Sequence, residues 1–382
     1  MCQSYTVQIQ NVVRAATFFQ HAGIAMIIVF IPIMAKDITA SFLEVGLIVA
    51  SYSLAQILSE LYFGRRSDAS GHRMIFIRAG FIGCAIVFGL HYFATDALLL
   101  LVARISAGIV TGIMIPAFVA YSYELTGDGR QAATVISFHA LGWMVGILAT
   151  GVVGDIGLAF LVSSAFFVGG FVLTLRLPEA GFGSGPVSGS IRRIISKNRY
   201  LFWAVLLRHI AASAVWTILP VILVEYMDAQ LYHISVIYVV NTFTAFIIMN
   251  MMVHKIQITD RRKIQVGLAG IIPAILGMSI INEWWMAMPF MVLVGISWAM
   301  LFVGGNFYLM ERNPHSTSSG LFSSTISVAT VIGPVIGGTI AAITDYQYVM
   351  YVSAIIAGGG LMSSILIPTL SPNETSPDPP PS

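Results

Sequence analysis

Residues 64–73 read GRRSDASGHR, a short charged break between two long apolar runs at residues 43–63 and 74–93. Each run meets the requirement of roughly 20 residues for a helix that crosses a bilayer. The break contains three arginines, and short loops rich in Lys and Arg stay on the cytoplasmic side of a membrane. The stretch therefore predicts two membrane-spanning helices that are joined by a cytoplasmic turn.

The composition of the whole chain supports a membrane protein. Of its 382 residues, 57% are hydrophobic and only 9% are charged, whereas soluble domains carry roughly 25% charged residues. The sequence contains no His-Glu-xx-His pair, no aligned Ser-His-Asp set and no phosphate-binding loop. We therefore expect neither an enzyme nor an ATP-driven pump, and no cofactor, metal site or nucleic-acid partner.

Further apolar runs of spanning length recur along the chain. The twelve predicted helices cover residues 12–35, 43–63, 74–93, 97–120, 132–154, 157–177, 201–224, 233–253, 264–282, 285–308, 320–343 and 347–368. Backbone groups in lipid must be satisfied within the chain, and the runs show no strand-like alternation, so the predicted fold is all-α.

The positions of the basic residues test this assignment. With a cytoplasmic N-terminus, sixteen of the nineteen Lys and Arg residues fall on the cytoplasmic side. Lys36 alone falls outside, and Arg104 and Arg208 fall within spans. One missed helix would reverse the side of every later loop. The pattern predicts a multi-pass protein of the plasma membrane with both termini in the cytoplasm.

The chain divides into two similar halves. We expect a six-helix bundle over residues 1–177, a cytoplasmic linker over 178–200, a second six-helix bundle over 201–368 and a disordered cytoplasmic tail over 369–382. The basic end of the linker predicts a short surface helix. The halves echo each other where Asp68 and Arg73 match Asp260, Arg261 and Arg262, and where Gly146 and Gly151 match Gly333 and Gly338. Such a repeat is typical of transporters whose substrate site lies between the halves.

Residues 64–73 resemble the signature loop of the major facilitator superfamily, although Ala69 stands where a basic residue is usual. The residues that carry the resemblance are Gly64, Asp68, Gly71 and Arg73 in this loop, Asp260 and Arg261 in a degenerate second copy, Arg104, Gly108 and Gly112 in the fourth run, and Gly333, Pro334, Gly337 and Gly338 in the eleventh run. The resemblance implies two pseudo-symmetric six-helix bundles that work as a monomer in the lipid bilayer.

The loop motif has a physical interpretation. Gly64 and Gly71 would permit a tight helix exit and a turn. Asp68 could face the positive N-terminal end of a helix that begins near Ser318, Ser319 and Gly320. The family resemblance implies that this contact latches the outward-open state.

Polar side chains inside the predicted spans are the candidates for a site that handles substrate and protons. They are Arg104, Arg208, His21, Gln20, His139, Asn306 and Trp216. Charges within spans are costly and usually functional, although a structural arginine bonded to carbonyls, or an Arg208 that snorkels to the headgroups, is the alternative. His209 lies about 100° around the helix from Arg208, so we expect the two to face different directions. His21 and His139 are either proton carriers or neutral packing residues.

The leading hypothesis is a secondary transporter that moves a small organic solute, with an anion as one candidate, by alternating access and with proton coupling. Two buried arginines without a buried carboxylate favour an anion or a neutral solute. The glycine motifs and Met-rich spans favour the alternative, a multidrug exporter of the same fold. A membrane sensor that does not transport, or a lipid-handling protein, is the second alternative.

Overall fold

The computed structural model describes residues 2–39, 41–126, 129–179, 191–254, 258–311, 313 and 315–368. Part of the predicted linker (180–190) and the predicted tail (369–382) lie outside these residues. The helices are α1 (Cys2–Ile28), α2 (Ile31–Ile38), α3 (Phe42–Ser70), α4 (Arg73–Leu90), α5 (Ala97–Thr126), α6 (Gly129–Val153), α7 (Ile156–Thr174), α8 (Ile191–Lys197), α9 (Arg199–Met227), α10 (Leu231–His254), α11 (Asp260–Met278), α12 (Ala287–Met310), α13 (His315–Ile343) and α14 (Tyr346–Ile365), with short 3₁₀ turns η1 (His91–Phe93) and η2 (Trp284–Met286).

The predicted all-α membrane fold is confirmed. Within the described residues, ten helical segments are long and apolar enough to span a bilayer. Two of the twelve predicted spans, α6 and α11, are not among these ten segments, each for a reason in its own sequence. The described apolar part of α6 is the shorter segment Phe138–Val153, and α11 begins with four charged residues, DRRK. Both helices nevertheless pack extensively against other helices of the chain, α6 on α1 and α11 on α12.

Two of the first helices differ from the predictions in a way that matters for the motif. The first run is not one helix, because it breaks after Ile28 and resumes as α2, with Pro32 in its first turn. The second run does not end at Gly64, because α3 continues to Ser70 and ends at Gly71, whose φ of 68° is the left-handed conformation that glycine accepts most readily. The prediction that Gly64 forms a helix exit is therefore wrong, whereas the turn at Gly71 is confirmed.

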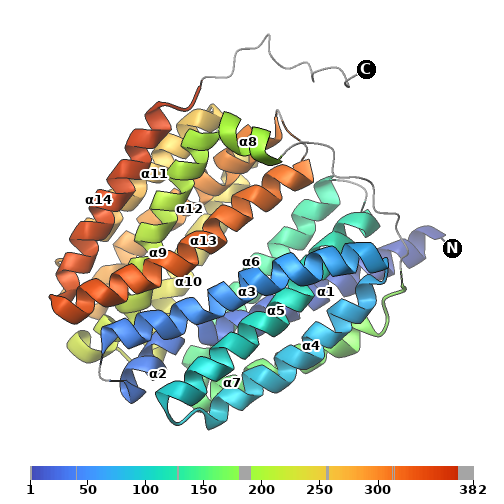
Figure 1. Cartoon of the computed structure of the whole chain (residues 1–382), viewed down its shortest axis with the longest axis horizontal. Coiled ribbons are helices and arrows are strands. Elements are labelled where there is room, and N and C mark those ends of the chain that lie inside the picture. The colour runs from blue at the N-terminus through green and yellow to red at the C-terminus, as the bar shows by residue number, and fades with distance from the viewer. Residues whose placement is uncertain are drawn as a thin grey trace.

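The helices form two groups (Figure 1). Helices α1 and α3–α7 pack against one another, and helices α9–α14 do the same. Corresponding hydrogen bonds recur in the two groups: the Tyr121 hydroxyl donates to the Pro178 carbonyl (3.0 Å), and the Tyr308 hydroxyl donates to the Pro368 carbonyl (3.1 Å). The two halves of the sequence thus build the same local contact twice.

Glycine contacts correct the register of the repeat that the sequence predicts. Gly142 and Gly146 of α6 lie against the α1 backbone at Phe18 and Ala22, and Gly333 and Gly337 of α13 lie against the α9 backbone at Ile210 and Ala214. Gly142 therefore corresponds to Gly333 and Gly146 to Gly337, one helical turn away from the predicted pairing of Gly146 with Gly333.

The two groups join at the end of the molecule where α2 lies. We call this the α2 end, and the opposite end, where α8 lies, the α8 end. At the α2 end, Gly46 of α3 lies against Pro334 and Gly338 of α13, and Gly151 of α6 lies against Ser235 of α10. Among the residues that the structure describes, the glycine contacts, hydrogen bond and ion pair that join the groups all lie there. The ribbons of α3 and α13 separate toward the α8 end (Figure 1).

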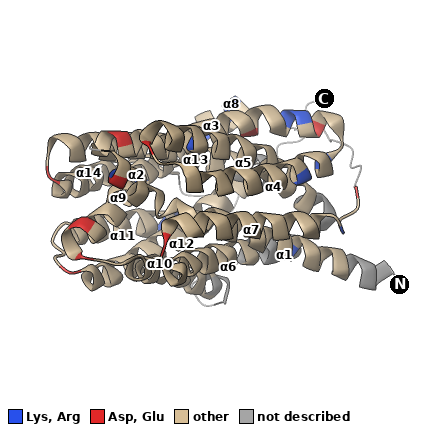
Figure 2. Cartoon of the chain, turned by 90° about the horizontal axis from the view of Figure 1, so that it is seen from below, with Lys and Arg blue, Asp and Glu red and all other residues tan. Residues whose placement is uncertain are grey.

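Charged side chains are distributed unequally along this axis. Most basic residues lie toward one end of the molecule, whereas acidic residues lie at both ends and include those in the loops of the opposite end (Figure 2). The ion pair between Lys36 Nζ and Glu225 Oε1 (3.2 Å) crosses between α2 and α9 at the α2 end. The basic helix α8 confirms the predicted surface helix before the seventh span.

Candidate functional site

The candidate site begins one helical turn inside the contact between α6 and α10. At that contact the Ser235 hydroxyl donates to the Ile147 carbonyl (2.8 Å). Trp143 precedes Ile147 by four residues on α6, and Tyr238 follows Ser235 by three on the antiparallel α10. With a rise of 1.5 Å per residue, the two lie about 4.5–6 Å along the helix axes from the hydrogen bond, both toward the α8 end. The two aromatic residues therefore lie at the same depth on opposite bundles.

Trp143, Trp216 and Tyr238, which we call the ring cluster, come from three helices. Trp216 of α9 meets Tyr238 edge to face, with ring centroids 6.0 Å apart. Trp143 and Trp216 pack against the same apolar core to which Tyr238 belongs, and this core also includes Ala25 and Phe30 of the first span. The ring cluster thus lies where both bundles contribute to one core.

Three polar atoms around this cluster have no hydrogen-bond partner among the described residues. They are Trp143 Nε1, the Tyr238 hydroxyl and Asn241 Oδ1, one turn further along α10. A buried polar group without a partner costs roughly 1–3 kcal/mol. Unpartnered groups are uncommon in folded proteins, and several at one place require an explanation.

His21 and His139 form a stacked pair beside the ring cluster. Their ring centroids lie 3.7 Å apart with an angle of 19° between the planes, and His139 lies 6.3 Å from the Trp143 ring. Gly142 permits this approach, because a Cβ atom there would lie 3.1 Å from His21 Cβ and closer still to the Phe18 carbonyl oxygen. His21 Nδ1 donates to the Thr17 carbonyl (2.9 Å), which leaves Nε2 as the free nitrogen.

Arg104 lies apart from the ring cluster, inside the first bundle. Its side chain is 2% exposed, and its guanidinium lies 4.3 Å from the centre of the Tyr52 ring on α3. Gly108 and Gly112 continue the same face and lie against the α3 backbone near Tyr52 and Gln56. The predicted packing face is confirmed, and the observed partner of Arg104 is the aromatic ring of Tyr52.

Arg208 lies inside the second bundle and does not snorkel, because it is only 3% exposed. Its Nη2 donates to Ser297 Oγ (3.3 Å) and its guanidinium lies 5.5 Å from the Trp298 ring. Its Nη1 also lies 3.3 Å from His209 Nε2. The expectation that Arg208 and His209 face different directions is therefore wrong, because the long arginine stem spans the 100° between neighbouring positions.

The two remaining predicted residues are buried. Gln20 of α1 is 2% exposed and Asn306 of α12 is 8% exposed, and each has one side-chain oxygen without a partner. Asn306 Nδ2 donates to the Phe302 carbonyl (2.9 Å). The structure thus brings together His21 and His139 beside the ring cluster that contains Trp216, and it keeps Arg104 and Arg208 within separate bundles.

Sequence reasoning missed Trp143, Tyr238 and Asn241. Tryptophan and tyrosine inside spans usually indicate packing or anchoring at the interface with water. The helices that carry them are apolar on all sides, so periodicity does not mark the face that meets the other bundle. Only the contact between α6 and α10 identifies these residues.

The signature stretch forms contacts within its own bundle. Asp68 is exposed at the α8 end and pairs with Arg73 Nη1 at 2.8 Å. In the second copy, Asp260 pairs with Lys263 (2.7 Å), and Arg261 Nη2 donates to the Ile365 carbonyl (2.8 Å). At the start of α13, the buried Ser318 hydroxyl donates to the Leu309 carbonyl (3.4 Å), and the side chain of Ser319 lies outside the described residues.

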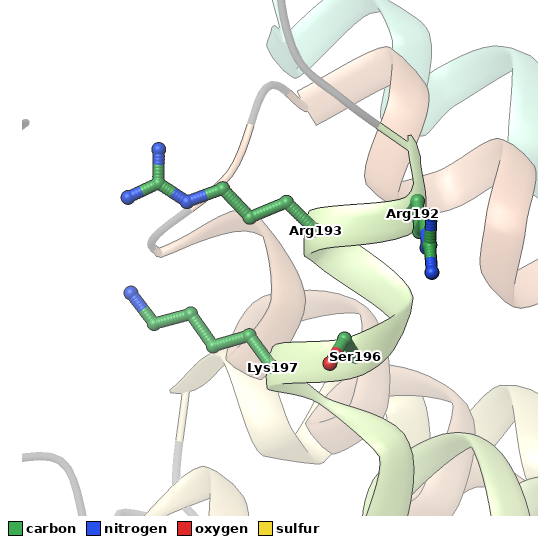
Figure 3. A pocket seen from close by; sticks show the side chains of 4 residues that line it. All are labelled: Arg192, Arg193, Ser196 and Lys197. Atoms are coloured by element: carbon green, nitrogen blue, oxygen red, sulfur yellow. The ribbon is translucent and has the colours of Figure 1, made fainter.

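A separate hollow lies on the surface helix α8. It is lined by Arg192, Arg193, Ser196 and Lys197. Arg193 and Lys197 extend side by side in one direction, and Arg192 points away from them (Figure 3). Ile194 on the same helix is buried and holds α8 against the bundle. This hollow is a basic surface at the α8 end, distant from the ring cluster.

The described part of the chain contains no group of three His, Cys, Asp or Glu side chains that could hold a metal ion.

Comparison with known proteins identifies the family of this fold. The family model described as Major Facilitator Superfamily matches residues 15–319. An uncharacterized MFS-type transporter of Methanocaldococcus jannaschii is 26% identical over 164 residues, which is 42% of each chain.

A second relative is the multidrug resistance protein MdtG of Proteus mirabilis, 26% identical over 222 residues, 53% of this chain and 54% of that protein. The chain thus matches about half the length of these relatives or less. Among solved structures, a mutant of the nucleoside transporter NupG has a TM-score of 0.80 at 11% identity and covers 94% of this chain and 99% of its own. An inward-facing bacterial homolog of the lysosomal transporter Spinster has a TM-score of 0.75 at 14% identity, with coverage of 95% and 97%.

Proposed function

The chain belongs to the major facilitator superfamily, and on this premise we propose that it is a secondary transporter that moves a small organic solute by alternating access. The observation that carries the proposal is the one-sided closure of the two bundles. Small glycine faces, Gly46 on Gly338 and Gly151 on Ser235, bring the bundles together at the α2 end. Rocking about such close contacts would expose a site near the middle of the membrane to each side in turn.

We further propose that the α8 end faces the cytoplasm of the cell that carries the protein in its plasma membrane. The exposed basic residues of this end support that orientation, and they include Arg65, Arg66 and the α8 cluster. With this orientation both termini are cytoplasmic and the conformation is inward-facing. We further propose that residues 178–200 connect two six-helix units. Asp68 would then take its latch contact with the start of α13 only in the outward-facing state, in which the α8 ends approach each other.

The arrangement of the arginines narrows the proposed substrate. Arg104 lies over Tyr52, and Arg208 donates to Ser297 on a second helix. Neither guanidinium reaches the ring cluster, so the buried arginines do not by themselves favour an anion. A neutral small solute is the proposal that the site supports best. The multidrug exporter is the second candidate, supported by the ring cluster and by the likeness to MdtG.

Proton coupling is the finer proposal, and it depends on the His21–His139 pair. Two imidazolium charges at the observed stacking distance of 3.7 Å would repel each other by about 4.5 kcal/mol at an effective dielectric constant of 20. The pair would therefore hold at most one proton. His139 is exposed and Trp143 separates it from the closed α2 end. A proton could thus enter from the α8 end and be released when the bundles rearrange.

Transport by purified protein in proteoliposomes tests these proposals together. The panel contains neutral aromatic amides, aliphatic and aromatic carboxylates and lipophilic cations, and each uptake is measured with and without an imposed pH gradient. Protein-mediated flux above that of empty liposomes supports the transporter. Flux that ignores the pH gradient contradicts proton coupling, and saturable binding without flux of any bound solute favours a sensor.

A further inference from the structure

We propose that the ring cluster of Trp143, Trp216 and Tyr238 binds a neutral, planar aromatic solute that carries an amide-like group. This inference rests on the proposed transport function and specifies the substrate class of its site. It assigns the solute to the interface of α6, α9 and α10, rather than to the buried arginines.

The first support is the arrangement of the rings. They come from both bundles, and Trp143 and Trp216 are each only partly buried although they pack on a common core. Edge-to-face and offset ring pairs at 4.5–7 Å are favourable, and the Trp216–Tyr238 pair already has this geometry at 6.0 Å. A flat ring is the ligand shape that such surfaces recognise best, because its face and edge both find partners.

The second support is the set of unpartnered polar atoms. Trp143 Nε1 and the Tyr238 hydroxyl can each donate a hydrogen bond, and Asn241 Oδ1 can accept one, yet none has a partner in the described residues. A primary amide has the complementary pair, a carbonyl oxygen that accepts and an N–H that donates. A ligand that enters between these side chains with this group would satisfy donors and an acceptor that are buried without a partner in this conformation.

The absence of charge among the site residues also favours a neutral solute. The three ring residues and Asn241 carry no formal charge, and the buried Arg104 and Arg208 contact Tyr52 and Ser297 within their own bundles. A charged solute at the ring cluster would therefore be desolvated without a fixed counter-ion, which is costly. Neutral solutes avoid this cost.

Three probes of similar size separate these features. Benzamide has the ring and the amide, cyclohexanecarboxamide keeps the amide without the aromatic ring, and benzoate keeps the ring with a negative charge. Binding of each radiolabelled probe to the purified full-length protein is measured by equilibrium dialysis at pH 8, where histidines with ordinary pKa values are neutral. We expect benzamide to bind about 3- to 10-fold more tightly than either of the other probes.

Variants locate the binding site. Trp143→Leu removes the ring and should weaken benzamide binding about 5- to 10-fold, whereas Trp143→Phe keeps a ring without the N–H and should weaken it about 3-fold. Trp216→Leu provides an independent test in case Trp143→Leu lowers the folded yield. Trp203→Leu is the matched control on α9, because Trp203 is 56% exposed and should leave binding unchanged.

Equal affinities for benzamide and cyclohexanecarboxamide, including no binding of either, would overturn the inference, as would tighter binding of benzoate. Loss of benzamide binding in Trp203→Leu as large as in Trp143→Leu would also overturn it. Transport of an aliphatic carboxylate without binding of benzamide would leave the proposed transporter standing and reject the substrate class. Selective benzamide binding without flux of any solute would support the ligand class and reject the proposed transporter.

Discussion

The contact of Gly46 with α13 leads to a quantitative prediction for Gly46→Ala. A Cβ atom at Gly46 would lie 3.1 Å from the Pro334 carbonyl carbon and 3.3 Å from Gly338 Cα, and nearer still to the Pro334 oxygen. Carbon atoms in contact prefer separations of about 3.5–4.0 Å. The added methyl group meets backbone rather than a movable side chain, so α3 and α13 would have to move apart by about 0.5–1 Å.

The expected shift follows from the place of this contact. Extra volume in a well-packed contact costs about 1–3 kcal/mol. Gly46 meets the other bundle only when the α2 end is closed, so the cost falls on the observed conformation and not on one in which this end is open. We therefore expect the ratio of closed to open molecules at the α2 end to fall by about 5- to 150-fold.

Distances between two spin labels measure this ratio. Leu98 of α5 and Ile343 of α13 lie at the α2 end of opposite bundles and are 68% and 77% exposed, so cysteines there accept labels. Cys2 is replaced by Ser, and the buried Cys84 is retained. Electron–electron double resonance should show a longer distance gaining population in Gly46→Ala.

Gly358→Ala is the matched control, because a Cβ atom at Gly358 on α14 meets nothing within 4 Å. A distance distribution for Gly46→Ala identical to that of the control would show that the Gly46 contact does not hold the α2 end closed. A lower thermal stability with an unchanged distribution would show that the cost lies within the first bundle rather than between the bundles.

Three further predictions use the same preparation. Lys36→Gln removes a partly exposed ion pair that contributes up to about 1 kcal/mol, so it should lower the ratio of closed to open molecules at the α2 end by at most about 5-fold. The exchange Lys36→Glu with Glu225→Lys should restore this ratio. Asp68→Asn should favour molecules that are open at the α8 end, because the predicted latch forms only when that end closes; labels at the α8 end measure this. Arg208→Ala should destabilise the protein by roughly 2–5 kcal/mol, seen as a lower Tm, because it empties a buried and hydrogen-bonded site, whereas Arg192→Ala on α8 should not.

Each of these predictions has a result that contradicts it. A charge exchange that fails to restore the distances would show that Lys36 and Glu225 act separately. An unchanged α8-end distance in Asp68→Asn would reject the latch. An Arg208→Ala protein with normal Tm and altered selectivity between anions and neutral solutes would place Arg208 at the substrate rather than in the bundle.

The apolar runs and the positions of the charges were sufficient to predict the membrane fold, because lipid allows helices that satisfy their own backbone and excludes most alternatives. The ends of the helices were less predictable. α3 continues for seven residues past the predicted end at residue 63 because polar residues such as Arg66 and Asp68 can remain helical in water, and Asp68 pairs with Arg73 at the start of α4. The hydropathy pattern marks where lipid ends, not where the helix ends.

The site was only partly predictable. His21 and His139 stood out because titratable groups within spans are costly wherever they point. Trp143, Tyr238 and Asn241 did not, because their importance depends on which face of α6 and α10 turns toward the other bundle. The two arginines were predicted to be buried, but only the packing showed that Tyr52 and Ser297 are their partners.

Hydropathy, charge and spacing are enough to show that this chain is a membrane protein built from a repeated set of apolar helices. Tertiary structure alone decided that stretch 64–73 is mostly helix, that the glycines pair one turn away from the predicted register, and that the bundles close at the α2 end. These features depend on rotation and approach of helices whose surfaces are apolar all round. Lipid and protein are equally acceptable neighbours for such surfaces, so composition cannot distinguish them, and close contacts such as that of Gly46 with Pro334 decide the arrangement.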